Sequence, residues 1–327
     1  MPLAPVYATQ YTRNVYTMAQ QQGSLLYNHV SHIDMVGEKR MIEMVKPYNG
    51  ELGGMLVQGF NNSTPDNLVE FARRVLVANA YHWGSMIDWQ EEQGMAPIID
   101  PTGPITQTGA YAMGRLLDQI IIQKGLYGPA IDFTRTNTVT RNNVEAKAVP
   151  GDSDMPAGSE SATSFPAGQK ILKNYGAESN CGLTLKKLIH ARSLLGKSQI
   201  PMKAPGQEVV CVIGQSQLDD MLNIPEIQSA DYNTIRALVA GEVDTYLGFK
   251  FVIVDESLLP ATTASGHTTM TCFAYLKSNV VLAEPQPIKT TINQRPDKCN
   301  NWQVYSKLKA GSTRYEDKGV VQIECYY

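Results

Sequence analysis

The strongest local signal in this sequence is an amphipathic helix over residues 104–124. Apolar side chains recur there at steps of three and four residues, namely Met113, Leu116, Leu117, Ile120 and Ile121. We expect Thr102 or Thr106 to cap its start and Gly125 to end it. At about 1.5 Å per residue the helix would be roughly 30 Å long. This is a long rod for a domain of this size.

The residues before this helix predict extended structure. Residues 1–35 are polar, with a weak apolar rhythm, and favour an extended arm with one helical piece at 12–22. Residues 36–48 and 69–83 show the alternation of apolar and polar residues that is typical of strands. A connection rich in Gly, Asn and Pro joins them. A lone hairpin is marginally stable in water. Both segments therefore need a partner surface, in this chain or on a neighbour.

The residues after this helix predict a mixed fold. Residues 127–181 read as loop-rich and strand-poor, with 151–168 as an exposed loop. A helix follows at 183–196, capped by Thr184. We expect its buried face to hold Leu185, Leu188, Ile189 and Leu195. From residue 208, strands alternate with helices. The segments concerned are 208–214 (a strand buried on both faces), 216–223 and 229–243 (helices), and 248–257 (a strand), followed by strands in 270–285, 300–316 and 318–327.

The charged fraction and the net charge of the chain limit the classes of protein to which it can belong. Charged residues make up 18% of the chain, against roughly 25% in average soluble proteins. Either the surface is polar and neutral, or much of it is buried against other copies, because interface cores are depleted in charge. The arm carries only Arg13 and Asp34, whereas residues 51–100 hold two basic and seven acidic residues. The net charge of −3 excludes a general basic footprint for nucleic acid.

Targeting and redox signals are weak. No apolar run approaches the roughly 20 residues that cross a bilayer. The first residues lack the apolar core of a signal peptide. The five cysteines are scattered and never form a CxxC pair, so we expect reduced thiols: Cys181, Cys211, Cys272, Cys299 and Cys325.

The search for chemistry predicts no catalytic, cofactor-binding or metal-binding residue. Residues 193–198 end in Gly-Lys-Ser, but a phosphate loop needs glycine where Ala191 stands. His29 and His32 could share a helix face as metal ligands, although polar surface or interface residues fit better. The remaining candidates lack a supporting signature: His82, His190, His267, Cys211 as a nucleophile, and the acidic pairs Asp219-Asp220 and Glu91-Glu92.

Three charged residues lie in or shortly before the helix predicted at 104–124: Asp88, Arg115 and Asp118. Arg115 and Asp118 are three residues apart and can pair on one helix face. We expect a surface or intersubunit ion pair there, in preference to a functional charge.

The order of these segments resembles the major capsid protein of tailed double-stranded DNA bacteriophages, with the Hong Kong 97-type fold. The residues that carry the resemblance are AQQQGSLL (19–26), the stretches 72–101 and 110–128, the α/β unit 209–260 and the closing VVQIECYY. The resemblance extends over about 250 residues, and no single motif in it is as sharp as a catalytic signature.

The resemblance implies an α+β fold with five parts. These are an N-terminal arm (1–35), an extended hairpin or E-loop (36–85), a peripheral domain (86–204) with a spine helix at 104–124, an axial domain (205–275) and strands returning to the peripheral domain (276–327). It implies a non-enzymatic virion protein, made late in the bacterial host cytoplasm. This protein would self-assemble into pentamers and hexamers of an icosahedral shell enclosing DNA. Gly50, Gly53 and Gly54 would let the hairpin adjust between the two rings.

The implied partners are further copies of the chain, a portal protein, a separate scaffolding protein and a decoration or cement protein. Packaged double-stranded DNA would be held without sequence-specific binding, and no membrane or cofactor is implied. A separate scaffold is expected because only about 100 residues precede the spine helix. Some relatives form Lys–Asn isopeptide links; Lys39 and Lys46 lie near the hairpin, but no partner Asn or activating Glu can be matched, so this chemistry is not carried over.

Two alternatives remain. An encapsulin-like shell shares the fold but encloses enzymes, and the resemblance at 72–128 favours a virion. An α/β hydrolase or transferase built on 205–275 would need a nucleophile or phosphate loop at a strand end, which the sequence does not supply.

Overall fold

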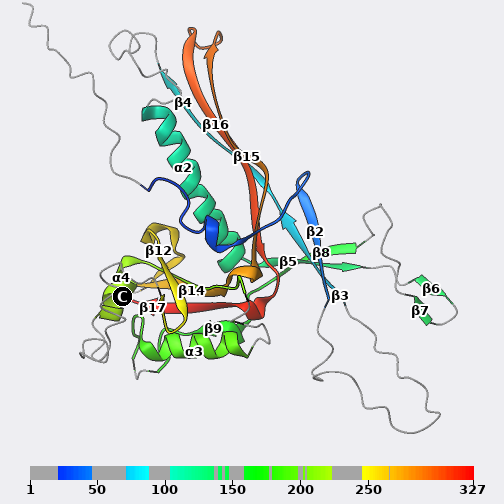
Figure 1. Ribbon diagram of the computed structural model, residues 1–327, viewed down its shortest axis with the longest axis vertical. Coiled ribbons are helices and arrows are strands. Elements are labelled where there is room, and N and C mark those ends of the chain that lie inside the picture. Colours follow the sequence, from blue (N-terminus) through cyan, green and yellow to red (C-terminus); the bar gives the residue numbers. More distant parts are fainter. Residues whose placement is uncertain are drawn as a thin grey trace, which may run out of the picture.

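The computed structural model describes residues 21–45, 71–87, 104–135, 139–141, 144–146, 158–176, 179–197, 202, 205–222, 245–264 and 266–327. Strands dominate, and a few helices lie against them (Figure 1). Predicted features outside these ranges include the helix at 229–243, most of the helical piece at 12–22, the glycine-rich connection, Asp88, Glu91 and Glu92.

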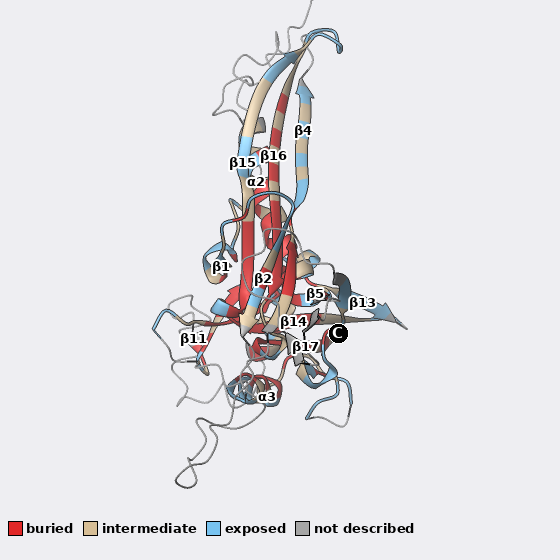
Figure 2. Cartoon of the chain, turned by 90° about the vertical axis from the view of Figure 1, so that its right-hand side faces the viewer, coloured by how far each residue is buried: buried red, intermediate tan, exposed pale blue. Residues whose placement is uncertain are grey.

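A tall sheet runs beside the long helix. Its strand order is β1-β15-β16-β4, and its strands are β1 (Ser31–His32), β15 (Val280–Arg295), β16 (Asn301–Arg314) and β4 (Asn79–Ile87). Helix α2 (Pro104–Ile120) packs against β16, β15 and β4. The sheet is buried near its base and exposed toward its far end (Figure 2).

A second sheet contains most of the core. Its order is β11-β12-β10-β14-β17-β9, with β13 paired to β14. The strands are β11 (Thr245–Tyr246), β12 (Phe249–Ile253), β10 (Val209–Ile213), β14 (His267–Leu276), β17 (Val320–Tyr326), β9 (Lys170–Ile171) and β13 (Ala261–Ala264). Every residue of β10 is buried, and β10 runs parallel to β12. The predicted doubly buried strand and the helix after it, α4 (Gln215–Leu222), are both confirmed.

A third sheet carries the hairpin, β2 (Lys39–Val45) and β3 (Phe71–Val77), in the order β2-β3-β5-β8. The other strands are β5 (Ala130–Arg135) and β8 (Gly158–Thr163), and a separate small pair consists of β6 (Val139–Arg141) and β7 (Val144–Ala146). The interpretation of 127–181 as strand-poor, with an exposed loop over 151–168, is therefore wrong for these stretches. GSESAT in β8 lacks apolar alternation, because β8 is an edge strand with mostly exposed side chains.

The predicted strand at 69–83 is two strands. It divides at Ala78: β3 pairs with β2, whereas β4 pairs with β16 in the tall sheet. At the crossing, a Cβ on Gly311 would lie 2.2 Å from the Val77 carbonyl oxygen. Only glycine allows the two backbones to approach this closely. The alternation of apolar and polar residues predicts extended backbone. It does not show where the chain passes from one sheet to another.

The long helix ends later than expected. It continues from α2 into a π-helical turn, η2 (Ile121–Tyr127), and its C-cap is Gly128. Gly125 is buried inside this turn, so the prediction that it stops the helix is wrong. Thr106 lies inside the helix and is not its cap, and Thr102 is outside the described residues. Gly125 is needed for packing, since a Cβ there would lie 2.5 Å from Ser312 Oγ.

Replacing Gly125 with alanine is expected to destabilise the protein by about 1–3 kcal/mol through overpacking, although the same change in an open helix stabilises. Gly168→Ala is the control, because nothing lies within 4 Å of a Cβ there. Urea unfolding of both variants measures the difference. Equal stability of the two variants would refute the packing role of Gly125.

Helix α3 (Leu185–Gly196) begins as predicted. Thr184 is its N-cap and accepts a hydrogen bond from Lys187 N at 3.4 Å. Its buried residues are Lys187, Leu188, Ala191 and Leu195. Ile189 is 52% exposed, so its place on the buried face is wrong. The short 3₁₀ turns are η1 (Tyr27–His29), η3 (Ala167–Gln169), η4 (Glu256–Leu258), η5 (Lys277–Asn279) and η6 (Asp317–Gly319).

Candidate functional site: the anchored N-terminal segment and the base of the hairpin

The candidate metal ligands do not converge. His29 Nδ1 lies 3.2 Å from Glu208 Oε2, whereas His32 Nε2 lies 2.9 Å from the Tyr27 carbonyl oxygen. The other histidines stack on tyrosines: His82 on Tyr305, His190 on Tyr175 and His267 on Tyr326. Among the described residues, no group of three or more His, Cys, Asp or Glu side chains could hold a metal ion.

The remaining chemical candidates are placed in structural roles. Cys211 is fully buried in β10, and burial raises the pKa of its thiol, which disfavours a nucleophilic thiolate. All five cysteines are free. Asp220 accepts hydrogen bonds from Leu183 N at 2.8 Å and from Tyr327 Oη at 2.7 Å. Gly196 is the last residue of α3, so the Gly-Lys-Ser stretch begins at a helix end and not between a strand and a helix start.

Asp118 anchors the end of the N-terminal segment to α2. Its carboxylate is completely buried. Its Oδ1 accepts from Ser24 Oγ at 2.5 Å and from Leu26 N at 3.0 Å. Its Oδ2 accepts from Gln21 Nε2 at 2.6 Å and from Leu25 N at 3.0 Å. The predicted surface or intersubunit ion pair is therefore wrong for Asp118, which is buried within its own chain.

Two glycines let the segment approach the helix. A Cβ on Gly114, one turn before Asp118, would lie 2.7 Å from Gly23 Cα. Gly23 itself has a φ of 140°, which side chains rarely adopt. Ser24 Oγ also accepts from Tyr27 N at 3.1 Å, at the start of η1. Residues 21–27 are thus fixed to α2 by backbone proximity and by one carboxylate.

A buried charge network fixes the base of the hairpin. Arg74, on β3, donates from Nε to Asp132 Oδ1 at 2.9 Å, from Nη1 to the Arg314 carbonyl at 2.9 Å and from Nη2 to Asp317 Oδ2 at 2.7 Å. Arg314 donates from Nε to Asp317 Oδ1 at 2.5 Å and from Nη1 to the Gly128 carbonyl at 2.6 Å. The four side chains balance in charge and join the hairpin to β5, β16 and the end of the long helix.

The two arginines of the network are shielded from water, whereas Asp132 and Asp317 are partly exposed. Arg314 is fully buried, and Arg74 is 7% exposed. The Arg314 guanidinium lies over the Phe165 ring, 5.0 Å from its centroid, a cation–π arrangement. Burial alone raises the pKa of Asp317, but hydrogen bonds from Arg74 and Arg314 outweigh it, so this pKa lies below its ordinary value. The Asp317 carboxylate at the hairpin base is therefore charged at neutral pH.

Lys187 connects helix α3 to the second sheet through hydrogen bonds. Its side chain is fully buried. The ammonium group lies within hydrogen-bond distance of four carbonyl oxygens, those of Lys173, Cys181, Gly182 and Glu324, at 2.8–3.1 Å. The carbonyls belong to the chain before α3 and to β17. One buried side chain thus connects the chain before α3 to strand β17.

Replacing Lys187 with methionine is expected to lower the free energy of unfolding by about 3 kcal/mol, because buried carbonyls lose a charged donor. Lys186→Met is the matched control: the neighbouring Lys186 is exposed, and its Nζ donates to one carbonyl, that of Gly176, at 3.2 Å. Thermal and urea unfolding would measure both. Equal losses for the two variants would contradict the role of the carbonyl cluster.

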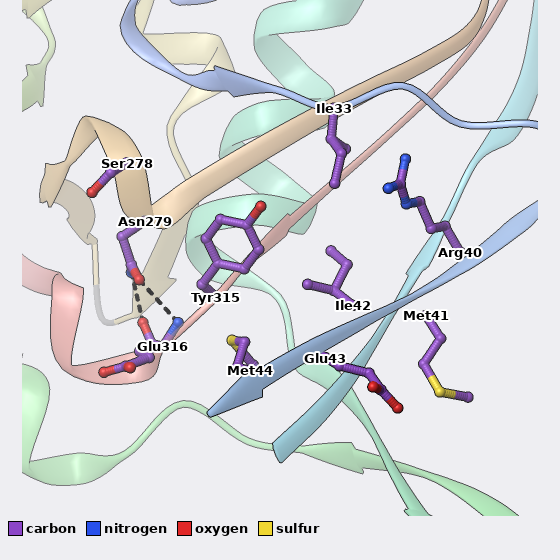
Figure 3. A pocket seen from close by; sticks show the side chains of 10 residues that line it. All are labelled: Ile33, Arg40, Met41, Ile42, Glu43, Met44, Ser278, Asn279, Tyr315 and Glu316. Carbon is purple, nitrogen blue, oxygen red and sulfur yellow. Dashed lines mark hydrogen bonds between the residues drawn. The ribbon is translucent and has the colours of Figure 1, made fainter. Parts of the chain in front are cut away.

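A groove of about 560 Å³ lies along β2 (Figure 3). Ile33, Ile42, Met44 and Tyr315 form its apolar wall. Other lining residues are Arg40, Met41, Glu43, Ser278, Asn279 and Glu316. Asn279 donates from Nδ2 to the Glu316 carbonyl at 2.6 Å and accepts from Glu316 N at 2.9 Å, which fixes the wall opposite β2.

The sequence predictions missed the residues of these clusters, apart from Asp118. Arg74 is separated from Asp132 by 58 residues and from Asp317 by 243. No spacing rule links residues so far apart. The nearest signal was the pair of arginines at 73 and 74 inside an apolar strand, because a charge within such a strand needs a partner.

The clusters described above join segments that lie far apart in the sequence. The model of the phage capsid protein family matches residues 3–326. The capsid of Ralstonia phage GP4 has 11% identity and a TM-score of 0.63, covering 100% of this chain and 98% of that chain. The capsid of cyanophage P-SCSP1u has 13% identity and a TM-score of 0.63, with 97% and 92% covered.

The cyanophage Pam1 capsid has 16% identity and a TM-score of 0.60, with 99% and 98% of the two chains covered. At these identities the likeness shows the fold, a mixed arrangement of sheets with few helices. Comparison with curated protein sequences found no match. Because the family model covers nearly the whole chain, this chain belongs to the phage capsid protein family.

Proposed function

We propose that this chain is the major capsid protein of a tailed double-stranded DNA phage, and that it self-assembles into pentamers and hexamers of an icosahedral shell around the DNA. The observation that carries the proposal is the family match over residues 3–326, together with capsid structures that align along the whole chain. Membership of a structural family also supports a protein that is not an enzyme.

The parts of the Hong Kong 97-type fold map onto the chain as follows in this proposal. The arm is 1–35, the E-loop 36–85 and the peripheral domain 86–204, with the spine helix at 104–124. The axial domain is 205–275, and 276–327 return to the peripheral domain. The second sheet crosses two of these boundaries, since β14 lies between β10 and β17 and the sheet ends in β9. The axial and peripheral parts would therefore move as one body along this sheet.

Further copies of the chain are the main partners in this proposal. A portal protein, a separate scaffolding protein, a decoration protein and packaged DNA without sequence-specific contacts complete the set. Synthesis would take place in the bacterial host cytoplasm. Among the described residues, no helix is long and apolar enough to span a membrane. The named relatives are phage capsids, so the comparisons do not favour the encapsulin-like alternative.

Mass measurement of the purified protein tests the proposal. Analytical ultracentrifugation, with and without a co-expressed scaffolding protein, should find closed particles of many copies. A chain that stays monomeric under all of these conditions would overturn the proposal. Particles that carry a cargo enzyme and no DNA in the native source would reinstate the encapsulin-like alternative.

A further inference from the structure

One face of the tall sheet is open. Side chains alternate between the two faces of a strand. On β16, the even-numbered residues of 304–310 are buried, whereas the odd-numbered residues of 303–309 are half-buried. Helix α2 lies on the buried face, because a Cβ on its Gly109 would lie 2.6 Å from the Trp83 ring and 3.3 Å from Ser306 Oγ. The odd-numbered side chains of β16 therefore point away from α2, toward the side of the sheet that Figure 2 shows as half-buried or exposed at its far end.

This open face carries cations and amides. Residues directly opposite each other in a ladder share a face, so the register with β16 adds the odd-numbered residues of 289–295 on β15. The face thus holds the cations Lys289, Arg295, Lys307 and Lys309 and the amides Asn293 and Gln303. Two carboxylates form ion pairs with it: Glu38, 3.4 Å from Lys309 Nζ, and Asp297, 2.5 Å from Arg295 Nη2. Lys289 and Lys307 lie between these two ion pairs along the strands.

Two lysines and a histidine form a row across three strands of this face. Lys289 is directly opposite Lys307, and Lys307 is directly opposite His82 on β4. In the described part of the chain, no ion pair includes either lysine. Like charges directly opposite each other destabilise a sheet. An anion bound over the row would remove this repulsion.

We propose that the open face of the tall sheet binds the phosphates of double-stranded DNA, with Lys289 and Lys307 at the centre of the contact. The inference rests on the proposed function, because the DNA enclosed by the shell supplies the anion. Residues 303–309 span about 20 Å at roughly 3.4 Å per residue. A duplex carries one negative charge per about 1.7 Å of its axis, so about twelve charges would lie along this length.

The composition of the face favours DNA over a protein partner. The odd-numbered residues of 289–295 and 303–309 include no aliphatic apolar side chain, whereas the centre of a protein interface is normally apolar. Lysine, arginine and amide side chains are the donors that phosphate contacts use, and such contacts do not read sequence. The net charge of −3 excludes a general basic footprint, so these cations form a local site.

Binding of a duplex of about 20 base pairs to the unassembled chain tests the inference. Fluorescence anisotropy gives the binding constant K at salt concentrations from about 50 to 200 mM. Replacing both lysines (Lys289→Gln with Lys307→Gln) should make the slope of log K against log salt less steep by about 1.8, or 0.9 for each lysine. Replacing two exposed lysines elsewhere, Lys197→Gln with Lys318→Gln, changes the net charge equally and should leave the slope unchanged. Thermal unfolding is the control for folding: the first variant should unfold at no lower temperature than the natural chain, because it loses the lysine repulsion.

Lysine acetylation of particles from the native source supplies a second readout. Mass spectrometry should find several-fold less acetylation of Lys289 and Lys307, relative to Lys197 and Lys318, in DNA-filled particles than in the same particles emptied of DNA. Equal salt slopes for the two variants would overturn the inference. Protection that persists after the DNA is removed would also overturn it and assign the face to a protein partner. Both results leave the proposed shell intact, whereas particles whose shell lacks this chain would overturn the proposed function.

Discussion

Replacing Asp118 with alanine is expected to free residues 21–26 from α2 and to lower the free energy of unfolding by about 3 kcal/mol or more. The carboxylate accepts four hydrogen bonds, two of them from the backbone amides of Leu25 and Leu26. Leu26 is fully buried, so its amide would lose its partner without gaining water. Urea unfolding of the unassembled protein measures the loss, and hydrogen exchange at Leu25 and Leu26 locates it.

Asp34→Ala is the matched control, because this exposed aspartate lies in the same N-terminal region. It should leave both measurements nearly unchanged. Asp118→Asn should fall between the two, since an amide keeps one acceptor oxygen and presents N–H groups to donors on the other side. Under the proposed function, Asp118→Ala also reduces the yield of closed particles. Unchanged protection at Leu25 and Leu26 in Asp118→Ala would contradict the anchor.

Replacing Asp317 with asparagine is expected to cost about 3–5 kcal/mol of stability, because two buried guanidinium groups lose the carboxylate that they share. Arg74 and Arg314 both donate to Asp317, and each would remain charged although its side chain is buried. The hairpin base should loosen with them. Thermal unfolding measures the cost, and exchange of the β3 amides shows whether the loss lies at the hairpin.

Asp297→Asn is the control for this change. Asp297 also pairs with an arginine, Arg295, at 2.5 Å, but both side chains are exposed, so little stability should be lost.

The pH dependence of stability gives a second test of the Asp317 network. The pKa of Asp317 lies below its ordinary value in the folded protein, so its contribution is complete above the unfolded pKa, about 3.9. The stability gap between the natural protein and Asp317→Asn should shrink as the pH falls from about 4 through the lower folded pKa. A gap that does not change down to the acid transition would contradict this role of the network.

The sequence predicts well those elements whose signal is local. Helix α2 follows from apolar residues at helical spacing, and the Thr184 cap and the buried strand β10 are found where the pattern puts them. The errors come from tertiary contacts. Gly125 has the local character of a helix stop, yet it is buried against Ser312, 187 positions later in the sequence (312 − 125).

The candidate site is less predictable than the fold for the same reason. A helical pattern assigns lysine to the outside and isoleucine to the inside, but α3 buries Lys187 and exposes Ile189. The carbonyls that make this favourable include that of Glu324, 137 residues away. The division of residues 69–83 between two sheets likewise depends on Gly311 passing the backbone at Val77. Neither fact has a signature in the neighbouring residues.

The central claim is that copies of this chain build a closed shell around DNA, and electron cryomicroscopy of particles from the native source tests it most directly. We expect icosahedral particles filled with DNA, in which pentamers and hexamers of this chain fit the density. Particles whose shell is formed by another protein, with this chain absent from it, would contradict the account.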